Sequence, residues 1–172
     1  MLTVFVLRHA KSSRSDAGSI ADSDRPLAPR GRRAAARVAA WMREEGYIPD
    51  LIVCSPARRT RETCELVAPA LGDDVAVRFD AALYLADAAR LLQRLRATPK
   101  GTRAVLLIGH NPGLHEFAMR LAGSGDGDAL ARLKRKFPTA ALAVLRFELH
   151  NWADIAENQG RLEAVIRPRD LA

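Results

Sequence analysis

Short apolar runs alternate along the chain with stretches in which apolar residues recur every three or four positions. Several of the short runs are continuously apolar, as in strands that are buried on both faces of a sheet. The predicted strands cover residues 2–7, 51–54, 75–79, 104–108, 141–147 and 162–166. Helical spacing predicts helices over residues 32–46, 56–71, 87–97 and 112–122. This alternation predicts a three-layer α/β/α fold whose central sheet is mostly parallel.

The length and composition predict one folded domain over residues 1–172. The 172 residues are 48% apolar and 27% charged, so the chain is long enough to bury a core, and no linker divides it. The stretch "GSGDG", Gly123 to Gly127, is predicted to be a flexible loop. It begins the least regular part of the chain, residues 123–137, and whether that part forms a lid stays open at this point.

The apolar runs are all short, which bears on where the protein is found. None approaches the roughly 20 residues that span a bilayer, and residues 2–7 are too few for the core of a signal peptide. We therefore expect a soluble, cytoplasmic protein. Cys54 and Cys64 lie in apolar surroundings without metal-ligand spacing, so both are predicted to be buried and reduced.

The formal net charge of +7 comes mainly from arginine, because only four of the 27 basic residues are lysines. A planar guanidinium group binds phosphate or carboxylate through parallel hydrogen bonds. The charge is therefore compatible with anionic partners, although it does not by itself identify one.

Polar residues follow several of the predicted strands directly. Arg8 and His9 end the first strand, Ser55 follows the second, and His110 and Asn111 follow the fourth. In an open α/β sheet, ligands bind beyond the carboxyl ends of the strands. Two of the chain's four histidines occupy such ends, so we expect them to share one site.

Histidine and arginine together suit phosphoryl transfer. An imidazole is largely neutral near neutral pH and attacks phosphorus without a separate base. Guanidinium groups hold the oxygens on which negative charge is spread during the transfer, and the N-termini of helices following Ser55 and Asn111 would add backbone amides. The pattern predicts phosphoryl transfer through a phosphohistidine, without a metal or any other cofactor.

Four segments in order resemble the histidine phosphatase superfamily: "LRHAKSS", "SDRPLAPRG", "VCSPARRTRET" and "LLIGHNPGL". Within it, the chain is most similar to the small, SixA-like phosphohistidine phosphatases. The resemblance runs from Leu2 to about Leu121, and the later segment "LEAVIRPRDL" fits as well. It implies the phosphoglycerate mutase-like version of the α/β/α fold.

The resemblance also implies roles for particular residues. His9 corresponds to the nucleophile, Arg8 and Arg59 to phosphate ligands, and His110 to a second histidine that contacts the phosphoryl group. Arg59, rather than Arg58, matches because the family arginine follows Ser-Pro after two intervening residues.

Several neighbours of these residues are predicted to support them. Ser15 or Ser12, in the loop after His9, would add a hydroxyl contact to phosphate, and Asn111 would shape the His110 loop. Lys11 and Arg14 either face an acidic protein surface or are simply exposed basic residues.

The chain departs from the family pattern in two places. The usual Arg-His-Gly is Arg-His-Ala here, so Ala10 must adopt a backbone conformation that tolerates a Cβ. The glutamate general acid of the larger sugar-phosphate members has no good match, and Asp80 is the nearest candidate by position. An alkoxide is a very basic leaving group and needs a proton donor, whereas imidazole departs as a neutral ring. The missing acid therefore favours a phosphohistidine substrate.

The sequence predicts an enzyme that removes phosphate from phosphohistidine on a signalling or phosphotransfer protein. One alternative is a broad phosphomonoesterase of small phosphorylated substrates that uses Asp80, Asp16 or Glu116 as its acid. Another is a non-catalytic module that binds phosphorylated or polyanionic partners through the same basic residues. We expect neither a nucleic-acid partner nor a membrane, and the oligomeric state stays open.

Overall fold

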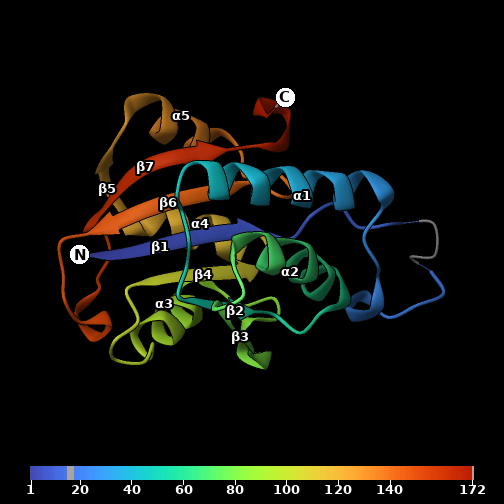
Figure 1. Ribbon diagram of the computed structural model, residues 1–172, viewed down its shortest axis with the longest axis horizontal. Coiled ribbons are helices and arrows are strands. Elements are labelled where there is room, and N and C mark those ends of the chain that lie inside the picture. Colours follow the sequence, from blue (N-terminus) through green and yellow to red (C-terminus); the bar gives the residue numbers. More distant parts are fainter. Residues whose placement is uncertain (15–17, 172) are drawn as a thin grey trace.

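One sheet of seven strands lies at the centre of the computed structural model, which describes residues 1–14 and 18–171. The strands are β1 (Leu2–Arg8), β2 (Leu51–Cys54), β3 (Ala76–Phe79), β4 (Ala104–Gly109), β5 (Ala122–Gly125), β6 (Leu142–Phe147) and β7 (Gly160–Ile166). Their order across the sheet is β3-β2-β4-β1-β6-β7-β5 (Figure 1). Among these strands, β6 runs opposite to its neighbours β1 and β7, and the other pairs are parallel. The mostly parallel sheet predicted from the sequence is confirmed.

Helices cover both faces of this sheet (Figure 1). They are α1 (Pro29–Glu44), α2 (Arg58–Leu71), α3 (Ala88–Arg96), α4 (Gly113–Leu121) and α5 (Gly127–Arg135). Short 3-10 turns occur at η1 (Asp22–Asp24), η2 (Ala81–Leu83), η3 (Trp152–Asp154) and η4 (Pro168–Asp170). Apolar residues of α1 and α2 pack on one face, and those of α3, α4 and α5 pack on the other. The three-layer α/β/α architecture is therefore confirmed.

The central strand β1 shows why two cores form. Val4 and Val6 belong to the core beneath α3, α4 and α5, whereas Phe5 and Leu7 belong to the core beneath α1 and α2. Alternate side chains of a strand point to opposite faces, so a continuously apolar strand supplies both cores. All four of these side chains are buried.

The stretch predicted to be a flexible loop forms part of the sheet instead. Residues 122–125 are the edge strand β5, paired with β7, and α5 follows directly. A Cβ at Gly123 would lie 1.8 Å from the carbonyl oxygen of Asn158, so this glycine permits close approach to a neighbouring backbone. Asp126 caps α5 by accepting a hydrogen bond from the Ala129 amide at 2.9 Å.

The two cysteines and the hydropathy of the helices can also be compared with the sequence predictions. Cys54 and Cys64 are both buried and neither forms a disulfide, as predicted. Among the described residues, no helix combines the length and the apolar character needed to cross a bilayer.

Three parallel strands bring their carboxyl ends together at one edge. In the β1–β4 pair, Arg8 lies opposite Gly109, and in the β2–β4 pair Cys54 lies opposite Ile108. The chain segments that follow β1, β2 and β4 therefore leave the sheet side by side. This register places the loop after β1, the start of α2 and the start of α4 around one point.

Candidate active site

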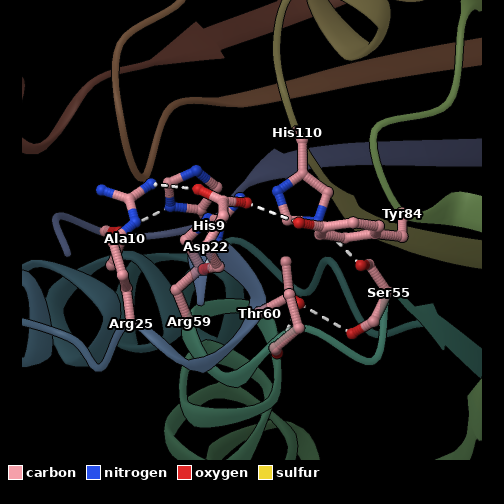
Figure 2. Close-up of polar contacts among 10 residues, drawn as sticks. His9, Ala10, Asp22, Arg25, Ser55, Arg59, Thr60, Tyr84 and His110 are labelled. Atoms are coloured by element: carbon pink, nitrogen blue, oxygen red, sulfur yellow. Dashed lines mark hydrogen bonds and ion pairs between the residues drawn. The ribbon is translucent and has the colours of Figure 1, made fainter. Parts of the chain in front are cut away.

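Two histidines meet at the carboxyl ends of β1 and β4. His9 follows β1, and its backbone amide donates to the carbonyl of Gly109 at 3.1 Å. His110 follows β4, and the centroids of the two imidazole rings are 5.4 Å apart. Both side chains are buried, at 6% and 3% exposure. Figure 2 shows the two rings near each other. The structure thus places the two histidines together, where the sequence predicted a shared site.

Two arginines complete the cluster. Arg8 ends β1 and donates from Nη1 to the carbonyl oxygen of Phe137 at 3.2 Å. Arg59 lies in the first turn of α2 and is 3% exposed. Both line a pocket of about 600 Å³ together with His9 and His110. Four groups that suit phosphoryl binding and transfer therefore face one pocket.

The hydrogen bond of the His9 ring determines which nitrogen is free. Nδ1 of His9 lies 2.8 Å from the carbonyl oxygen of Ala10. A carbonyl oxygen only accepts, so Nδ1 of the neutral ring carries the proton and Nε2 keeps its lone pair. His9 is therefore in the tautomer that a nucleophile requires at Nε2.

A second hydrogen bond orients His110. Its Nε2 lies 2.7 Å from the hydroxyl oxygen of Ser55, the residue that follows β2. The hydroxyl has no other acceptor among the described residues, so it donates to Nε2 and the His110 proton resides on Nδ1. In Figure 2, one ring nitrogen of His110 points toward His9 while Ser55 lies on the other side of the ring. His110 thus presents an N–H donor toward His9.

Several buried polar atoms of this cluster make no hydrogen bond within the described part of the chain. They are Nε of Arg8, Nε of Arg59, Nδ1 of His110 and Oδ1 of Asn111. Buried donors usually have a partner, because leaving one unpaired costs about 1 to 3 kcal/mol. Three of these atoms are donors on the residues that surround His9, an arrangement that suits an anionic ligand.

Burial lowers the pKa of both histidines. The pKa of His9 falls to about 4, mainly through desolvation and also through the charges of Arg59, Arg8 and Arg25. The pKa of His110 falls to about 3, again mainly through desolvation, with a contribution from Arg59. Both rings are therefore neutral near neutral pH. Burial also lowers the pKa of Arg8, and the neighbouring charge of Arg59 acts in the same direction.

These shifts predict a stability that falls with acid. Each histidine binds a proton more weakly in the folded chain than in the unfolded chain, where its pKa is about 6.5. The stabilisation that comes from keeping both rings neutral is thus complete above pH 6.5. It decreases as the pH falls below 6.5 and is lost as the pH falls through 4 toward 3. We expect the free energy of unfolding to drop by on the order of 5 kcal/mol from neutral pH to the lower end of this window.

Chemical denaturation across this pH range checks the expectation. The variant His9→Asn/His110→Asn should lose most of the pH dependence, whereas His115→Asn, altered outside the pocket, should keep it. Equal slopes in all three proteins would show that the two buried imidazoles do not cause it.

Asp22, an acidic residue that the sequence pattern did not indicate, also belongs to the site. Its Oδ2 accepts hydrogen bonds from Nη2 of Arg59 at 3.0 Å and from the hydroxyl of Tyr84 at 2.6 Å. Its Oδ1 pairs with Nη2 of Arg25 at 3.0 Å (Figure 2). The Tyr84 hydrogen bond, with help from Arg59 and Arg25, lowers the pKa of Asp22 to about 2. The carboxylate is therefore ionised, and it lies against an arginine that lines the pocket.

This position predicts that Asp22 weakens the binding of anions. The variant Asp22→Asn should bind inorganic phosphate about tenfold more tightly, because a negative charge beside the pocket is removed. The backbone carbonyl of Asp22, which accepts from Nη1 of Arg59 at 2.7 Å, is retained. Isothermal calorimetry would measure the dissociation constant, with Asp24→Asn in the same 3-10 turn as the control. Weaker binding by Asp22→Asn would instead mean that the carboxylate mainly positions Arg59.

Packing fixes the loop that follows His9. The Ala10 amide donates to Oγ1 of Thr63 at 3.0 Å, and Ala10 does not have a positive φ, so its Cβ is accommodated. A Cβ at Gly31 would lie 2.1 Å from the carbonyl oxygen of Lys11, which explains the glycine in the first turns of α1. Helices α1 and α2 therefore both hold this loop in place.

Asp80 does not join the cluster. Its Oδ1 accepts from the Ala82 amide at 2.9 Å, and its Oδ2 accepts from Nε of Arg94 at 2.6 Å. The side chain lines a separate pocket beside β3 and α3. The backbone of Asp80 follows β3 as expected, but the carboxylate caps η2 and binds α3. The carboxylate of Asp80, the nearest candidate by position for a general acid, is therefore not among the groups that line the His9 pocket.

The other predicted residues divide between the pocket and its surroundings. Ser12 and Asn111 line the pocket, and Nδ2 of Asn111 donates to the Phe137 carbonyl at 2.8 Å. Glu116 pairs with Arg120 on α4 and does not line the pocket. The predictions for Ser15 and Asp16 lie outside the described residues.

Comparison with known proteins identifies the family. The histidine phosphatase superfamily (branch 1) matches residues 4–84. An uncharacterized protein of Mycobacterium tuberculosis is 37% identical over 165 residues, which cover 95% of this chain and 100% of that protein. The chain is also similar to two solved structures of SixA proteins, each named as a candidate phosphohistidine phosphatase.

Both SixA structures match nearly the whole chain. The protein from Nakamurella multipartitia has a TM-score of 0.82 and 31% identity, covering 97% of this chain and 96% of that one. The protein from Agrobacterium tumefaciens has a TM-score of 0.82 and 30% identity, covering 97% and 98%. The chain therefore belongs to the histidine phosphatase superfamily, in its SixA-like group, with the phosphoglycerate mutase-like fold. This membership supports a hydrolase of the phosphatase class.

Proposed function

We propose that the protein removes phosphate from phosphohistidine on a signalling or phosphotransfer protein, through a phosphorylated His9. The observation that carries this proposal is the pair of buried, neutral imidazoles between Arg8 and Arg59. The names of the two SixA structures, which are candidate phosphohistidine phosphatases, support the same substrate class.

In the first step, Nε2 of His9 attacks the phosphorus atom of the substrate in line with the departing imidazole. A bond forms between Nε2 and phosphorus as the bond between phosphorus and the substrate nitrogen breaks, and the substrate ring, which carries a proton on its other nitrogen, departs as neutral imidazole. Arg8, Arg59 and Nδ1–H of His110 donate hydrogen bonds to the equatorial oxygens, where negative charge is spread. His9 needs no base, because its Nε2 is already unprotonated.

In the second step, water attacks the phosphorus atom of phospho-His9. The bond between Nε2 and phosphorus breaks, inorganic phosphate leaves, and a proton of the water passes to solvent. The Ala10 carbonyl holds Nδ1–H throughout, at 2.8 Å in this structure, so the ring returns to the same tautomer. No metal or other cofactor is required by this sequence of steps.

The acidic residues around the pocket favour an imidazole over an alkoxide leaving group. Asp22 is the carboxylate that lines the pocket in the described residues, and its pKa of about 2 leaves it without a proton to donate. Asp80 is bound to Arg94 elsewhere. An alkoxide, with water's pKa of roughly 15.7 as a guide, departs slowly without an acid. A phosphohistidine ring that is protonated on its other nitrogen departs as neutral imidazole, whose conjugate acid has a pKa of about 6.5, so it needs no acid from the enzyme.

Three matched peptides test the proposal, carrying phosphohistidine, phosphotyrosine or phosphoserine at the same position. Their leaving groups differ in basicity, so kcat should fall from phosphohistidine to phosphotyrosine to phosphoserine. We expect phosphoserine to be cleaved at least about a thousandfold more slowly than phosphohistidine. Comparable rates on phosphoserine would favour the broad phosphomonoesterase. Binding of all three peptides without release of phosphate would favour the non-catalytic module.

A further inference from the structure

A basic groove opens beside the candidate active site. It has a volume of about 600 Å³, and seven of the residues that line it are basic. Arg167 pairs with Asp170, and the other six have no acidic partner in the described part of the chain. We call these six the basic groove: Lys11, Arg30, Arg37, Arg135, Lys136 and Arg169. None of the described residues that line it is acidic. The groove is therefore a concentrated positive surface.

The groove is built from four parts of the chain, of which the loop after β1 supplies Lys11. Arg30 and Arg37 lie seven positions apart on α1, and the buried Ala34 lies between them on the same face. Arg135 ends α5 and Lys136 follows it, while Arg169 lies in η4. Ala34, Pro138 and Pro168 add apolar side chains to the lining of the groove. Such a surface suits a polypeptide that carries carboxylates.

The groove is continuous with the candidate active site. Lys11, Arg30, Lys136, Pro138 and Thr139 line both the groove and the pocket that holds His9. A ligand that extends away from the pocket over these shared residues enters the groove directly. Lys11 follows His9 closely in the chain, and its side chain lines both the groove and the His9 pocket.

The composition of the groove favours protein over nucleic acid. Proteins that bind single-stranded nucleic acid usually stack bases on aromatic side chains, and none of the described residues lining the groove is aromatic. A guanidinium group and a carboxylate pair through parallel hydrogen bonds, which suits an acidic protein segment.

We infer that the basic groove docks an acidic segment of the phosphorylated protein and thereby delivers its phosphohistidine to His9. This inference rests on the proposed function for the nature of the phosphorylated group, but docking itself is measurable without any reaction. The groove would raise affinity for acidic substrates and leave the chemical step unchanged, because Arg37, Arg135 and Arg169 do not line the His9 pocket. The effect should therefore fall on KM and not on kcat.

Two phosphohistidine peptides test the inference. One carries glutamates roughly four to eight residues from the phosphohistidine, a span of about 13 to 29 Å when extended, and the other carries glutamines there. Wild type should have a KM about tenfold lower for the acidic peptide at low salt, with equal kcat. High salt should remove the difference.

Charge reversal at two exposed groove residues supplies the matched variant. Arg37→Glu/Arg169→Glu should erase the preference for the acidic peptide and retain full kcat on the glutamine peptide. The control Arg33→Glu/Arg161→Glu changes the net charge equally at exposed residues that line neither space, and should keep the preference. Melting curves of both variants check that the fold is retained.

Binding of the unphosphorylated acidic peptide, measured by fluorescence anisotropy, separates the two proposals. If wild type hydrolyses neither phosphopeptide yet binds this peptide through the groove, the proposed function is wrong and docking stands. If it hydrolyses both phosphopeptides but the two double variants behave alike, docking is wrong and the function stands. Tighter binding of an oligonucleotide of equal charge at the same residues would overturn the assignment to an acidic protein segment.

Discussion

His9→Ala is expected to lose phosphohistidine hydrolysis by on the order of ten-thousandfold or more, because the variant lacks the nitrogen that accepts the phosphoryl group. His110, the other histidine among the residues that line the pocket, cannot replace it, because its Nε2 accepts from Ser55 and its Nδ1 carries a proton. Single-turnover kinetics with a phosphohistidine peptide measure this loss directly.

A matched control separates the loss of the nucleophile from a general effect of removing histidine. His115 stacks on Phe137 at a centroid distance of 5.7 Å and does not line the pocket, so His115→Ala should stay within about threefold of wild type in kcat. If His9→Ala retained a tenth of the wild-type rate, a different nucleophile or direct attack by water would have to carry the reaction.

Arg59→Ala is expected to lower kcat/KM by about a thousandfold, the second-largest effect. The guanidinium is 3% exposed, and its Nε is a buried donor without a partner among the described residues. Removing one preorganised donor from a charged transition state typically costs about a hundredfold to a thousandfold, and Arg59 offers more than one. Arg59→Lys should recover little, because an ammonium group cannot make two parallel hydrogen bonds.

Arg58 provides the control for this variant within the same turn of α2. Its Nε pairs with Glu62 at 3.0 Å on the exposed side of the helix, so Arg58→Ala should change kcat/KM by less than about threefold. Similar losses in the Arg58 and Arg59 variants would mean that the basic charge of the turn matters and the buried guanidinium does not. Full rescue by Arg59→Lys would also contradict the proposed two-point contact.

The positions that the sequence predicted well are those fixed by strand register. His9 and His110 directly follow buried, continuously apolar strands, and parallel pairing of β1 with β4 brings such residues together. Arg59 lies at the start of the helix that follows β2, so its place at the same edge also follows from the α/β pattern. The family resemblance added the roles proposed for these residues.

The residues that the sequence missed depend on contacts between distant segments. Asp22 lies in the 3-10 turn η1, and Tyr84 directly follows the 3-10 turn η2, 62 positions later in the chain. No hydrophobic periodicity in these turns indicates where the side chains point. Ser55 was placed at a strand end, but its hydrogen bond to His110 requires the register of β2 against β4. For Asp80 the position at a strand end was predicted correctly. Its side chain, however, pairs with Arg94 and does not line the His9 pocket.

The edge strand β5 was missed for a different reason. Glycine and serine are typical of loops, so "GSGDG" indicated flexibility. In the fold, Gly123 and Gly125 allow the chain to approach the backbones of Asn158 and Leu162 closely. Composition alone does not distinguish a glycine needed for close packing from one in a mobile loop.

Rapid quenching of the enzyme with a phosphohistidine peptide carrying labelled phosphate tests whether His9 carries the phosphoryl group during turnover. The quench must avoid acid, so that a phosphohistidine on the enzyme survives, and mass spectrometry then locates the label. Label should appear on His9 before inorganic phosphate is released, and it should disappear as hydrolysis proceeds. Release of phosphate with no labelled enzyme, or with label on a residue other than His9, would contradict a phosphorylated His9 intermediate.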